Sequence, residues 1–339
     1  MKTIILERPG RFTASETPAP TRPQPGNALV KVRSVGICGT DLHAYRGRQP
    51  FFTYPRILGH ELGVEIVEAE ENARGIGVGD RAAVEPYLDC GECAACRMGK
   101  PNCCERLCVM GVHVDGGMRE LIEVPIRKLH RSDALSCDQL ALVETLCIGR
   151  HAAARGRPAE GEWTLVVGAG PIGLSVMTAA KLEGARLIAA DLNADRLRFC
   201  REALGVEHTI CSAEEDLPQR LLEITGGALP SLVMDATGSP ASMEASFAYA
   251  SSGGRLVLVG LAQARVSFDD SEFHRKELTL MSSRNAAPSD FAAVIQQMER
   301  GLIDAGAWIN RRASADEMIE AFEDWTDPSS GAVKAVVSF

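Results

Sequence analysis

The sequence of 339 residues lacks an apolar run of the roughly eighteen residues that a membrane-spanning helix needs. It also lacks internal repeats and low-complexity tracts. Its opening stretch, MKTIILERPG, has only a brief apolar run before charged residues and a proline, which is too short for the core of a secretory signal. These absences predict a soluble, cytoplasmic protein with no membrane partner.

An excess of positive charge is also missing. The chain has 36 lysines and arginines against 45 aspartates and glutamates, for a net charge of −9. Because neutralising phosphates requires clustered basic residues, this balance argues against a nucleic-acid partner and favours small molecules. The 11 cysteines, with no secretory signal, indicate a reducing compartment in which thiols serve metals or catalysis rather than disulfides.

The length is too great for most single domains and predicts two domains with sizeable cores. Residues 1–145 alternate short β-rich runs with glycine and proline, which is typical of a mostly antiparallel barrel. Residues 146–282 read as strands alternating with helices, so the second domain is predicted to be α/β, with a doubly wound parallel sheet. Residues 283–339 are expected to return to the first domain.

A dense cysteine cluster stands in the run DCGECAACRMGKPNCCERLC. Cys90, Cys93 and Cys96 follow one another at intervals of three, and Cys104 lies eight residues further on. Four thiolates on a short loop can enclose zinc tetrahedrally and leave no open position, which is the mark of a structural site. Cys103 competes with Cys104 for the fourth position, and scattered buried cysteines are the alternative interpretation.

A glycine turn follows the apolar run WTLVV. Gly168, Gly170 and Gly173 match the pattern G-x-G-x-x-G, with Pro171 and Ile172 between the last two glycines. The first glycine permits a tight turn, the second lets the backbone approach a pyrophosphate, and the third lets the helix pack on the strand. The strand, turn and helix together predict a dinucleotide site.

Asp191 stands eighteen residues after Gly173, at the end of the next predicted strand. A carboxylate there would accept hydrogen bonds from the adenosine ribose and repel a 2′-phosphate, so the sequence favours NAD over NADP. Two alternatives remain open. Asp191 could instead cap the following helix, and Arg196 could reduce the repulsion of a phosphate.

Two glycine-rich segments, GICGTDLH and GHELG, bring further metal-ligand residue types into the first domain. Cys38 and His60, with Glu61 or Glu144, would supply a thiolate, an imidazole and a carboxylate while leaving one zinc position for substrate. This set predicts a second, catalytic zinc site. The alternative is that Cys38 and His60 are ordinary hydrogen-bonded loop residues.

Together these segments resemble the zinc-dependent medium-chain dehydrogenases, in particular their sorbitol dehydrogenase-like polyol and sugar-acid branch. The resemblance covers essentially the whole chain. It is carried by GICGTDLH, GHELG, GVGDRAAVEP, the four cysteines, VETLCIG and VVGAGPIG, and by YPRILGHE, GVHVDGG, FHRKE and SSRNA, which resemble the sugar-acid 5-dehydrogenases. It implies a GroES-like catalytic domain beside a Rossmann domain, a homodimer or homotetramer, and oxidation of a secondary alcohol to a ketone.

The resemblance also implies a role for each metal-site residue. Cys38 and His60 would be zinc ligands, and Glu61 would be a ligand or an exchanging partner. Glu144 would supply the carboxylate that this branch places in VETLCIG. Thr145 departs from the branch, which usually has proline there.

Three residues near Cys38 would assist the chemistry by the same resemblance. Asp41 would accept the N–H of His60 and fix its tautomer, as expected for a carboxylate beside a zinc-bound imidazole. Thr40 would hydrogen-bond the substrate hydroxyl, and the proton would pass through the nicotinamide ribose to His43. His43 could instead be a surface histidine.

For the substrate, the resemblance implies a sugar acid such as L-galactonate or L-gulonate, oxidised at C5. Arg284 in SSRNA would bind its carboxylate, and His274 with Arg275 could add a second positive region. The alternative is that Arg284 is a structural ion-pair residue and FHRKE a solvated surface.

Other functions remain as alternatives. They are a sorbitol, polyol or threonine-type dehydrogenase, an NADPH quinone reductase, and a zinc-stabilised NAD-binding regulator without turnover. Sorbitol enzymes have a tyrosine directly after GxDxH, where this chain has Ala44. A regulator would be expected to lose Cys38, His60 or Thr40, and all three are present.

Overall fold

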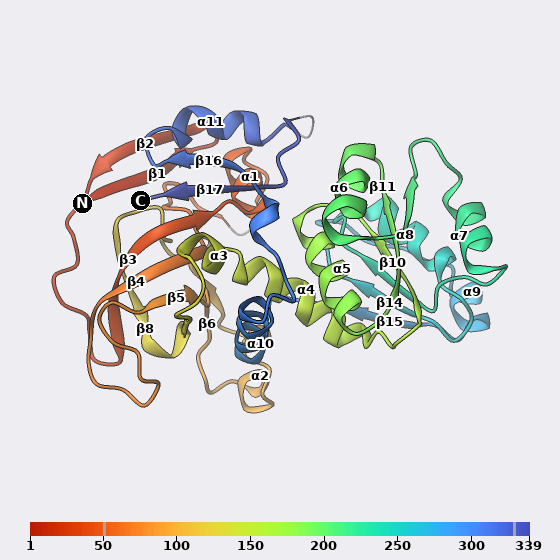
Figure 1. The fold of residues 1–339 in the computed structure, drawn as a ribbon, viewed down its shortest axis with the longest axis horizontal. Coiled ribbons are helices and arrows are strands. Elements are labelled where there is room, and N and C mark those ends of the chain that lie inside the picture. The colour runs from red at the N-terminus through yellow and green to blue at the C-terminus, as the bar shows by residue number, and fades with distance from the viewer. Residues whose placement is uncertain (50–51, 328–329) are drawn as a thin grey trace. The chain divides into compact units, whose positions relative to one another are not determined.

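A computed structural model describes residues 1–49, 52–327 and 330–339 (Figure 1). Its internal contacts divide the chain into two units. Unit 1 comprises Met1–Thr145 and Ala287–Phe339, and unit 2 comprises Leu146–Ala286. The sequence places the second boundary after residue 282, whereas the contacts place it after residue 286.

Unit 1 is built on a sheet that has seven strands in the described part of the chain, antiparallel except for β16 and β17. Its order is β16 (Ile309–Ser314), β17 (Lys334–Ser338), β3 (Asn27–Gly36), β4 (Glu61–Ala69), β5 (Arg81–Val84) and β9 (Leu129–Arg131), with β8 (Leu121–Pro125) also paired to β3.

The central strand β3 explains how this sheet collects distant parts of the chain. Its sequence NALVKVRSVG is rich in β-branched residues, and Val30, Val32 and Val35 are fully buried. On one side β3 pairs with β4, so that Gly36 lies opposite Glu61. On the other side the C-terminal strand β17 pairs with β3 through residues 336–338. The end of the chain therefore lies beside the segment that carries GICGTDLH.

The remaining strands and helices of unit 1 surround this sheet. The strands are β1 (Lys2–Arg8), β2 (Arg11–Glu16), β6 (Tyr87–Leu88) and β7 (Cys108–Val109). The α-helices are α1 (Gly39–Tyr45), α2 (Ala94–Arg97), α3 (Cys137–Ala141), α10 (Pro288–Glu299) and α11 (Met318–Trp325). The 3₁₀ turns are η1 (Pro101–Cys103), η2 (Ile126–Lys128) and η3 (Gly306–Trp308).

Unit 2 contains a parallel sheet with six strands among the residues described, ordered β12 (His208–Cys211), β11 (Arg186–Asp191), β10 (Trp163–Val167), β13 (Leu232–Asp235), β14 (Arg255–Leu258) and β15 (Thr279–Ser282). Its helices are α4 (Val143–Gly156), which begins in unit 1, α5 (Pro171–Leu182), α6 (Ala194–Leu204), α7 (Leu217–Thr225), α8 (Pro240–Tyr249) and α9 (Asp270–Arg275). The predicted doubly wound parallel sheet is confirmed (Figure 1).

The order of the parallel sheet fixes where a ligand can bind. The chain runs outward from β10 to β11 and β12, then returns to start again at β13 on the other side of β10. Ligands of such sheets bind at the carboxyl ends of the strands beside this reversal. The glycine turn begins at Gly168, directly after β10, and therefore lies at this point. In the residues that the structure describes, no helix is long and apolar enough to cross a membrane.

Candidate active site and metal centres

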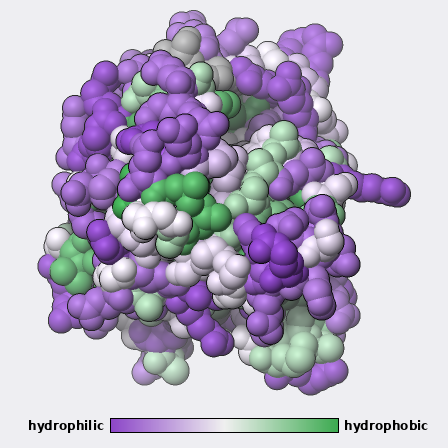
Figure 2. All heavy atoms as spheres, turned by 90° about the vertical axis from the view of Figure 1, so that its right-hand side faces the viewer, coloured by the Kyte–Doolittle hydropathy of each residue, from purple (hydrophilic) through white to green (hydrophobic). Residues whose placement is uncertain are grey.

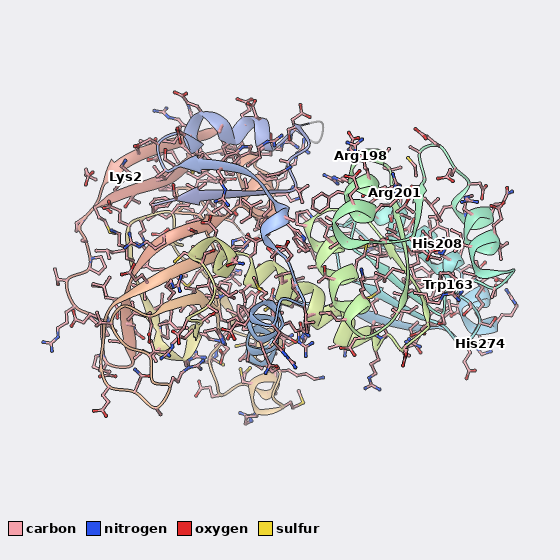
Figure 3. All side chains as sticks on the ribbon, viewed as in Figure 1. Lys2, Trp163, Arg198, Arg201, His208 and His274 are labelled. Carbon is pink, nitrogen blue, oxygen red and sulfur yellow. The ribbon has the colours of Figure 1, made fainter. Side chains whose placement is uncertain are left out.

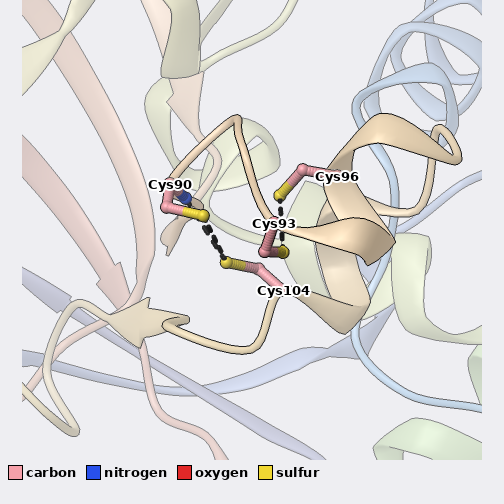
Figure 4. Close-up of side chains that lie close together, drawn as sticks. All are labelled: Cys90, Cys93, Cys96 and Cys104. Atoms are coloured by element: carbon pink, nitrogen blue, oxygen red, sulfur yellow. Dashed lines mark hydrogen bonds between the residues drawn. The ribbon is translucent and has the colours of Figure 1, made fainter.

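Four cysteine side chains converge on the loop between β6 and β7 (Figure 4). The sulfur atoms of Cys90, Cys93, Cys96 and Cys104, which we call the knuckle, lie within 4.8 Å of one another. The distance is 3.5 Å from Cys93 to Cys96 and 3.4 Å from Cys90 to Cys104. Tetrahedral zinc with bonds of about 2.3 Å requires sulfur atoms about 3.8 Å apart, so the knuckle fits a closed zinc site. Cys103 is exposed and lies outside this group.

Backbone N–H groups around the knuckle favour the thiolate form that zinc requires. Cys104 Sγ accepts from the N–H of Cys90 at 3.3 Å and from that of Arg106 at 3.4 Å. The N–H groups of Glu92 and Cys93 lower the pKa of the Cys90 thiol to about 6. Backbone N–H groups also lower the pKa of the Cys93 thiol, whereas loss of hydration and then the Cys93 thiol raise the pKa of Cys96 to about 12. The loop therefore favours thiolates at Cys90 and Cys93, and a bound cation would favour the thiolate at Cys96.

A second group of metal-ligand residues forms where β3 ends and β4 begins. Cys38 follows β3 and caps helix α1, His60 precedes β4, and Glu61 is its first residue. Ligand atoms of these three side chains lie within 4.8 Å of one another. His60 is 4% exposed and Glu61 is fully buried. One thiolate, one imidazole and one carboxylate form the type of donor set that holds a catalytic zinc.

Glu61 is held by an ion pair to the C-terminal strand. Lys334 Nζ donates to Glu61 Oε1 at 2.5 Å and also contacts Oε2, and both side chains are 1% exposed. Thr145 Oγ1 donates to Glu61 Oε1 at 2.6 Å and accepts from Lys334 Nζ at 3.0 Å. Burial opposes the charge of Glu61, but attraction to Lys334, and then to His60, keeps its pKa below the ordinary value. Gly36 leaves room for this carboxylate, because a Cβ atom there would lie 2.2 Å from Glu61 Oε2.

Asp41 adds a second buried carboxylate beside His60. Its Oδ2 accepts from the N–H of Cys38 at 2.9 Å, whereas its Oδ1 lies 3.7 Å from His60 Nδ1. Neither Oδ1 nor Nδ1 has a hydrogen-bond partner in the described structure. Burial works against a charged imidazole, yet the charges of Asp41 and then Cys38 raise the pKa of His60 well above its ordinary value. Such surroundings stabilise a cation at this point, which fits a zinc ion in place of the proton.

Glu144 lies in the first turn of α4 and is 5% exposed. Its Oε1 accepts a short hydrogen bond from Tyr87 Oη. Burial raises the pKa of Glu144. Attraction to His60 partly offsets this increase, and repulsion from Glu61 adds to it. Among the described residues, Glu144 is not part of the close group of Cys38, His60 and Glu61. The site therefore has one carboxylate paired with lysine and another bonded by tyrosine.

Thr40 and His43 both lie on α1, three residues apart and so on neighbouring positions of one helix face. Thr40 is partly buried and His43 is at the surface. Loss of hydration, followed by the charges of Arg48 and Arg46, lowers the pKa of His43. His43 is therefore neutral at pH 7 and can accept a proton.

The glycine turn has the geometry that a dinucleotide requires. Gly168 adopts a φ of +97°, which favours glycine, and a Cβ on Gly173 would lie 1.7 Å from Gly168 O. Gly170 caps α5, and Pro171 and Ile172 begin that helix. The helix N-terminus offers N–H groups and a favourable dipole to phosphate oxygens.

Asp191 ends β11 beside the glycine turn. Its carboxylate accepts from the N–H of Ala169 at 2.6 Å and from that of Asn193 at 2.8 Å. The cap of α6 is Asn193, so the structure does not support the alternative that Asp191 caps this helix. Arg196 reaches toward the turn, since its Nη1 lies 3.9 Å from the position of a Cβ on Gly170. The turn therefore carries an acidic and a basic side chain.

The two expected substrate residues lie at opposite edges of the parallel sheet. Arg284 follows β15 and so lies at the carboxyl edge, the edge of the glycine turn. His274 lies on α9, which leads into the amino end of β15. Figure 3 shows His274 on the same side of unit 2 as Trp163 and His208, the first residues of β10 and β12. His274 is therefore not retained as a substrate residue, because the cofactor turn lies at the other edge.

Sequence reasoning missed Lys334 and Tyr87, which hold the two carboxylates of the site. Lys334 interrupts the apolar run AVKAVVSF, and a charge at a buried strand position was the available signal. Tyr87 had no comparable signal, because its partner Glu144 lies 57 residues away.

Comparison with known proteins agrees with this geometry. Residues 24–134 match the alcohol dehydrogenase GroES-like domain, and residues 171–300 match the zinc-binding dehydrogenase family. The chain is 40% identical to the L-galactonate-5-dehydrogenase of Escherichia coli, over 100% of this chain and 99% of that protein. It is 34% identical to the starvation-sensing protein RspB of Escherichia coli, over 100% and 99% of the two chains.

The solved structures agree as well. A crystal structure of RspB from Escherichia coli, complexed with NADH, superposes with a TM-score of 0.93 at 33% identity and covers 100% of this chain and 99% of that one. The expected resemblance to sugar-acid dehydrogenases and the predicted zinc and NAD chemistry are thereby confirmed. The chain belongs to the zinc-type medium-chain alcohol dehydrogenase family and is an oxidoreductase that acts on CH–OH groups.

Proposed function

We propose that this enzyme oxidises the C5 hydroxyl of a sugar acid, L-galactonate or L-gulonate, to a ketone with NAD as the oxidant. The observation that carries the chemistry is the close group of Cys38, which is partly buried, and His60 and Glu61, which are buried. The observation that favours the substrate is the 40% identity, over the full chain, with an L-galactonate-5-dehydrogenase.

The residues have distinct tasks in this proposal. Cys38 and His60, with Glu61 or Glu144, would hold a zinc ion, and the turn of residues 168–173 with Asp191 would hold NAD. When bound, zinc acidifies a hydroxyl as a Lewis acid and NAD accepts a hydride. The knuckle would hold a second, structural zinc.

As the turn of residues 168–173 would hold the hydride acceptor, the remaining task of the protein is to remove the proton of the substrate hydroxyl. Thr40 Oγ1 would accept a hydrogen bond from that hydroxyl, and the imidazole of His43 would finally hold the proton. The negative charge of Asp41, 3.7 Å from His60 Nδ1 without a hydrogen bond, would favour a proton on that nitrogen and so leave Nε2 available as a ligand. His43 is suited to its task because its pKa is lowered, which leaves it neutral before the reaction.

Arg284 is proposed to bind the carboxylate of the sugar acid through its two-pronged guanidinium group. Replacing Arg284 by alanine is expected to cost about 1.5 to 3 kcal/mol in kcat/KM for L-galactonate and L-gulonate, and much less for neutral polyols. NADH absorbance with both acids, sorbitol and galactitol measures this difference.

Arg275→Ala is the matched control, since this exposed arginine on α9 pairs with Glu272 at the other edge of the sheet. It is expected to leave both substrate classes unchanged. Equal losses for acids and polyols in Arg284→Ala would exclude Arg284 as the carboxylate partner. A preference of the native enzyme for sorbitol would overturn the sugar-acid assignment and leave the zinc chemistry in place.

Asp191 is expected to make NAD the better cofactor by about a hundredfold or more in kcat/KM, because a 2′-phosphate would meet its charge at short range. Asp191→Ala should narrow that ratio, whereas Asp195→Ala, which removes an exposed carboxylate of α6, should not. Initial rates with NAD and NADP check this. Equal kcat/KM values of the native enzyme for NAD and NADP would show that Asp191 does not determine the choice of cofactor.

His43 is expected to set the acid limb of the pH profile. Its pKa is below 6.5, so kcat/KM should be constant near neutral pH and fall as the pH drops through that lowered value and the imidazole becomes charged. His43→Gln should lower the plateau by about tenfold or more and shift this limb. The control His274→Gln should keep the native profile, and an unchanged profile in His43→Gln would contradict the assignment.

We also propose that the enzyme is a cytoplasmic homodimer or homotetramer. Its 11 cysteines suit a reducing compartment. In unit 2, β15 ends the parallel sheet, and Leu280 and Leu261 are 38% and 70% exposed. Figure 2 shows small apolar patches among hydrophilic side chains on one face of the molecule. Light scattering tests the assembly, and a mass of 36.3 kDa in solution would exclude it.

A further inference from the structure

A buried charge cluster lies beside the knuckle and takes no part in the proposed chemistry. Lys128, at the end of η2, is 1% exposed, and its Nζ contacts carboxylates from two neighbouring points of the chain. One is Glu85, which directly follows β5 and is 1% exposed. The other is Asp89, whose side chain is 8% exposed and whose Oδ1 lies 2.7 Å from Nζ.

These two carboxylates flank the short segment that leads into the knuckle. Asp89 immediately precedes Cys90, the first knuckle cysteine. The N–H of Glu85 donates to Lys128 O at 2.8 Å, and Glu85 Oε2 lies 3.0 Å from His130 Nε2. Glu85 is thus fixed to the sheet on several sides. Asp89 is fixed by Lys128, which contacts its Oδ1, and by Arg127. Arg127 donates to Asp89 Oδ1 at 2.6 Å and to the carbonyl of Asp89 at 2.9 Å.

The knuckle loop is also held where β6 pairs with β7 at its two ends, and Asn102 and Cys104 within it are buried. Helix α2 within it has no buried residue, and the ion pair of Arg106 with Glu92 is exposed on both sides. Exposed pairs contribute about 0–1 kcal/mol, whereas a buried lysine between two carboxylates is held strongly. On the Cys90 side, the buried contact of Asp89 with Lys128 therefore adds to the pairing of β6, which ends at the residue before Asp89.

We propose that Lys128 is a positioning residue for the knuckle: it binds Asp89 and Glu85 with one ammonium group and thereby holds Cys90 in place to retain zinc. The proposal rests on the knuckle binding zinc and is independent of the substrate. Outer partners of metal ligands commonly change metal retention by about 10- to 100-fold.

The test compares Asp89→Asn with Glu85→Gln. Each change removes one carboxylate charge from the same Nζ atom and keeps the side-chain shape, but only Asp89 is joined to the knuckle. Zinc release to a chromogenic chelator is followed in the whole enzyme, and the knuckle phase is the one that Cys93→Ser removes. Thermal unfolding is measured in parallel to record the general loss of stability.

Asp89→Asn is expected to release knuckle zinc about tenfold faster than the native enzyme. Glu85→Gln is expected to release knuckle zinc within about twofold of the native rate. This should hold even if its unfolding temperature falls as much as that of Asp89→Asn. Equal rates in the two variants, or a native rate in Asp89→Asn, would overturn the proposal. A native enzyme without any knuckle zinc would instead refute the metal assignment.

A second variant keeps the test decisive if Asp89→Asn does not fold. The pair Lys128→Met with Glu85→Gln removes one positive and one negative charge together, so the buried cluster keeps its net charge while Asp89 loses the lysine. It is expected to release knuckle zinc as fast as Asp89→Asn. Release at the rate of Glu85→Gln alone would show that Lys128 does not hold the knuckle.

Discussion

Replacing Cys38 by serine is expected to reduce kcat/KM by at least about a thousandfold, because zinc as a Lewis acid supplies several kcal/mol to alcohol oxidation. A serine hydroxyl stays protonated at neutral pH and is a poor substitute for a thiolate ligand. Zinc analysis should show a fall from two ions per chain to one. NADH absorbance measures the turnover.

Cys93→Ser is the matched control, since it makes the same chemical change in the knuckle. It is expected to lower thermal stability, because a structural zinc contributes folding energy, and to affect the chemistry of the folded fraction only modestly. Cys103→Ser, at an exposed cysteine outside the knuckle, should change neither property. A Cys38→Ser enzyme that keeps two zinc ions or a tenth of the native turnover would exclude Cys38 as a ligand.

Features encoded by neighbouring residues were predictable from the sequence. The knuckle lies within 15 consecutive positions, from Cys90 to Cys104, and a loop of that length can bring its thiols together. The glycine turn was equally accessible, because the strand β10, the turn and the helix α5 follow one another directly. The spacing of residues along the chain was enough to predict both the knuckle and the glycine turn.

Pairings across the sheet were not predictable in the same way. Lys334 meets Glu61 across 273 positions, and only the placement of β17 beside β3 brings the two together. Sequence reasoning left open whether Glu61 or Glu144 is the direct zinc ligand. The structure distinguishes them by their partners, because Lys334 contacts one and Tyr87 the other.

Strand direction explains why one of the two substrate residues was misplaced. Arg284 and His274 are ten positions apart, and the sequence analysis assigned both to substrate binding, with His274 in a second positive region. The strand β15 separates them and carries the chain from the amino edge of the sheet to the carboxyl edge. A run of charged residues does not show which edge it occupies until the parallel order of the strands is known.

Replacing Lys334 by methionine is expected to destabilise the protein by about 3–5 kcal/mol, because it leaves the carboxylate of Glu61 buried without its partner. Urea unfolding at pH 7 measures this loss. The matched control is Arg33→Met. Arg33 also pairs with a glutamate of β4, Glu65, at 2.7 Å, but both side chains are more than a third exposed. That change should cost less than about 1 kcal/mol.

The pH dependence of Lys334→Met follows from the sign of the shift at Glu61. In the native protein Lys334 and His60 keep the pKa of Glu61 below 4.5, so this pair stabilises the fold above that pH and the stabilisation is lost as the pH falls further. Without Lys334, the largest attraction that lowers the pKa of Glu61 is lost, while burial continues to raise this pKa. The folded variant then takes up a proton more readily than the folded native protein does, so its deficit in stability should shrink as the pH falls below 7.

The double variant Glu61→Gln with Lys334→Met separates a lost ion pair from lost packing. Glu61→Gln alone leaves Lys334 buried with Thr145 as a neutral partner, and should also be destabilising. Removing both charges should recover most of the loss, since neither member then remains unpaired, and the deviation from additivity should reach about 2–3 kcal/mol. Additive effects of the two changes would mean that Lys334 acts only by filling space. If the double variant recovers stability but still contains less zinc than the native enzyme, the carboxylate of Glu61 is itself a ligand of the catalytic metal.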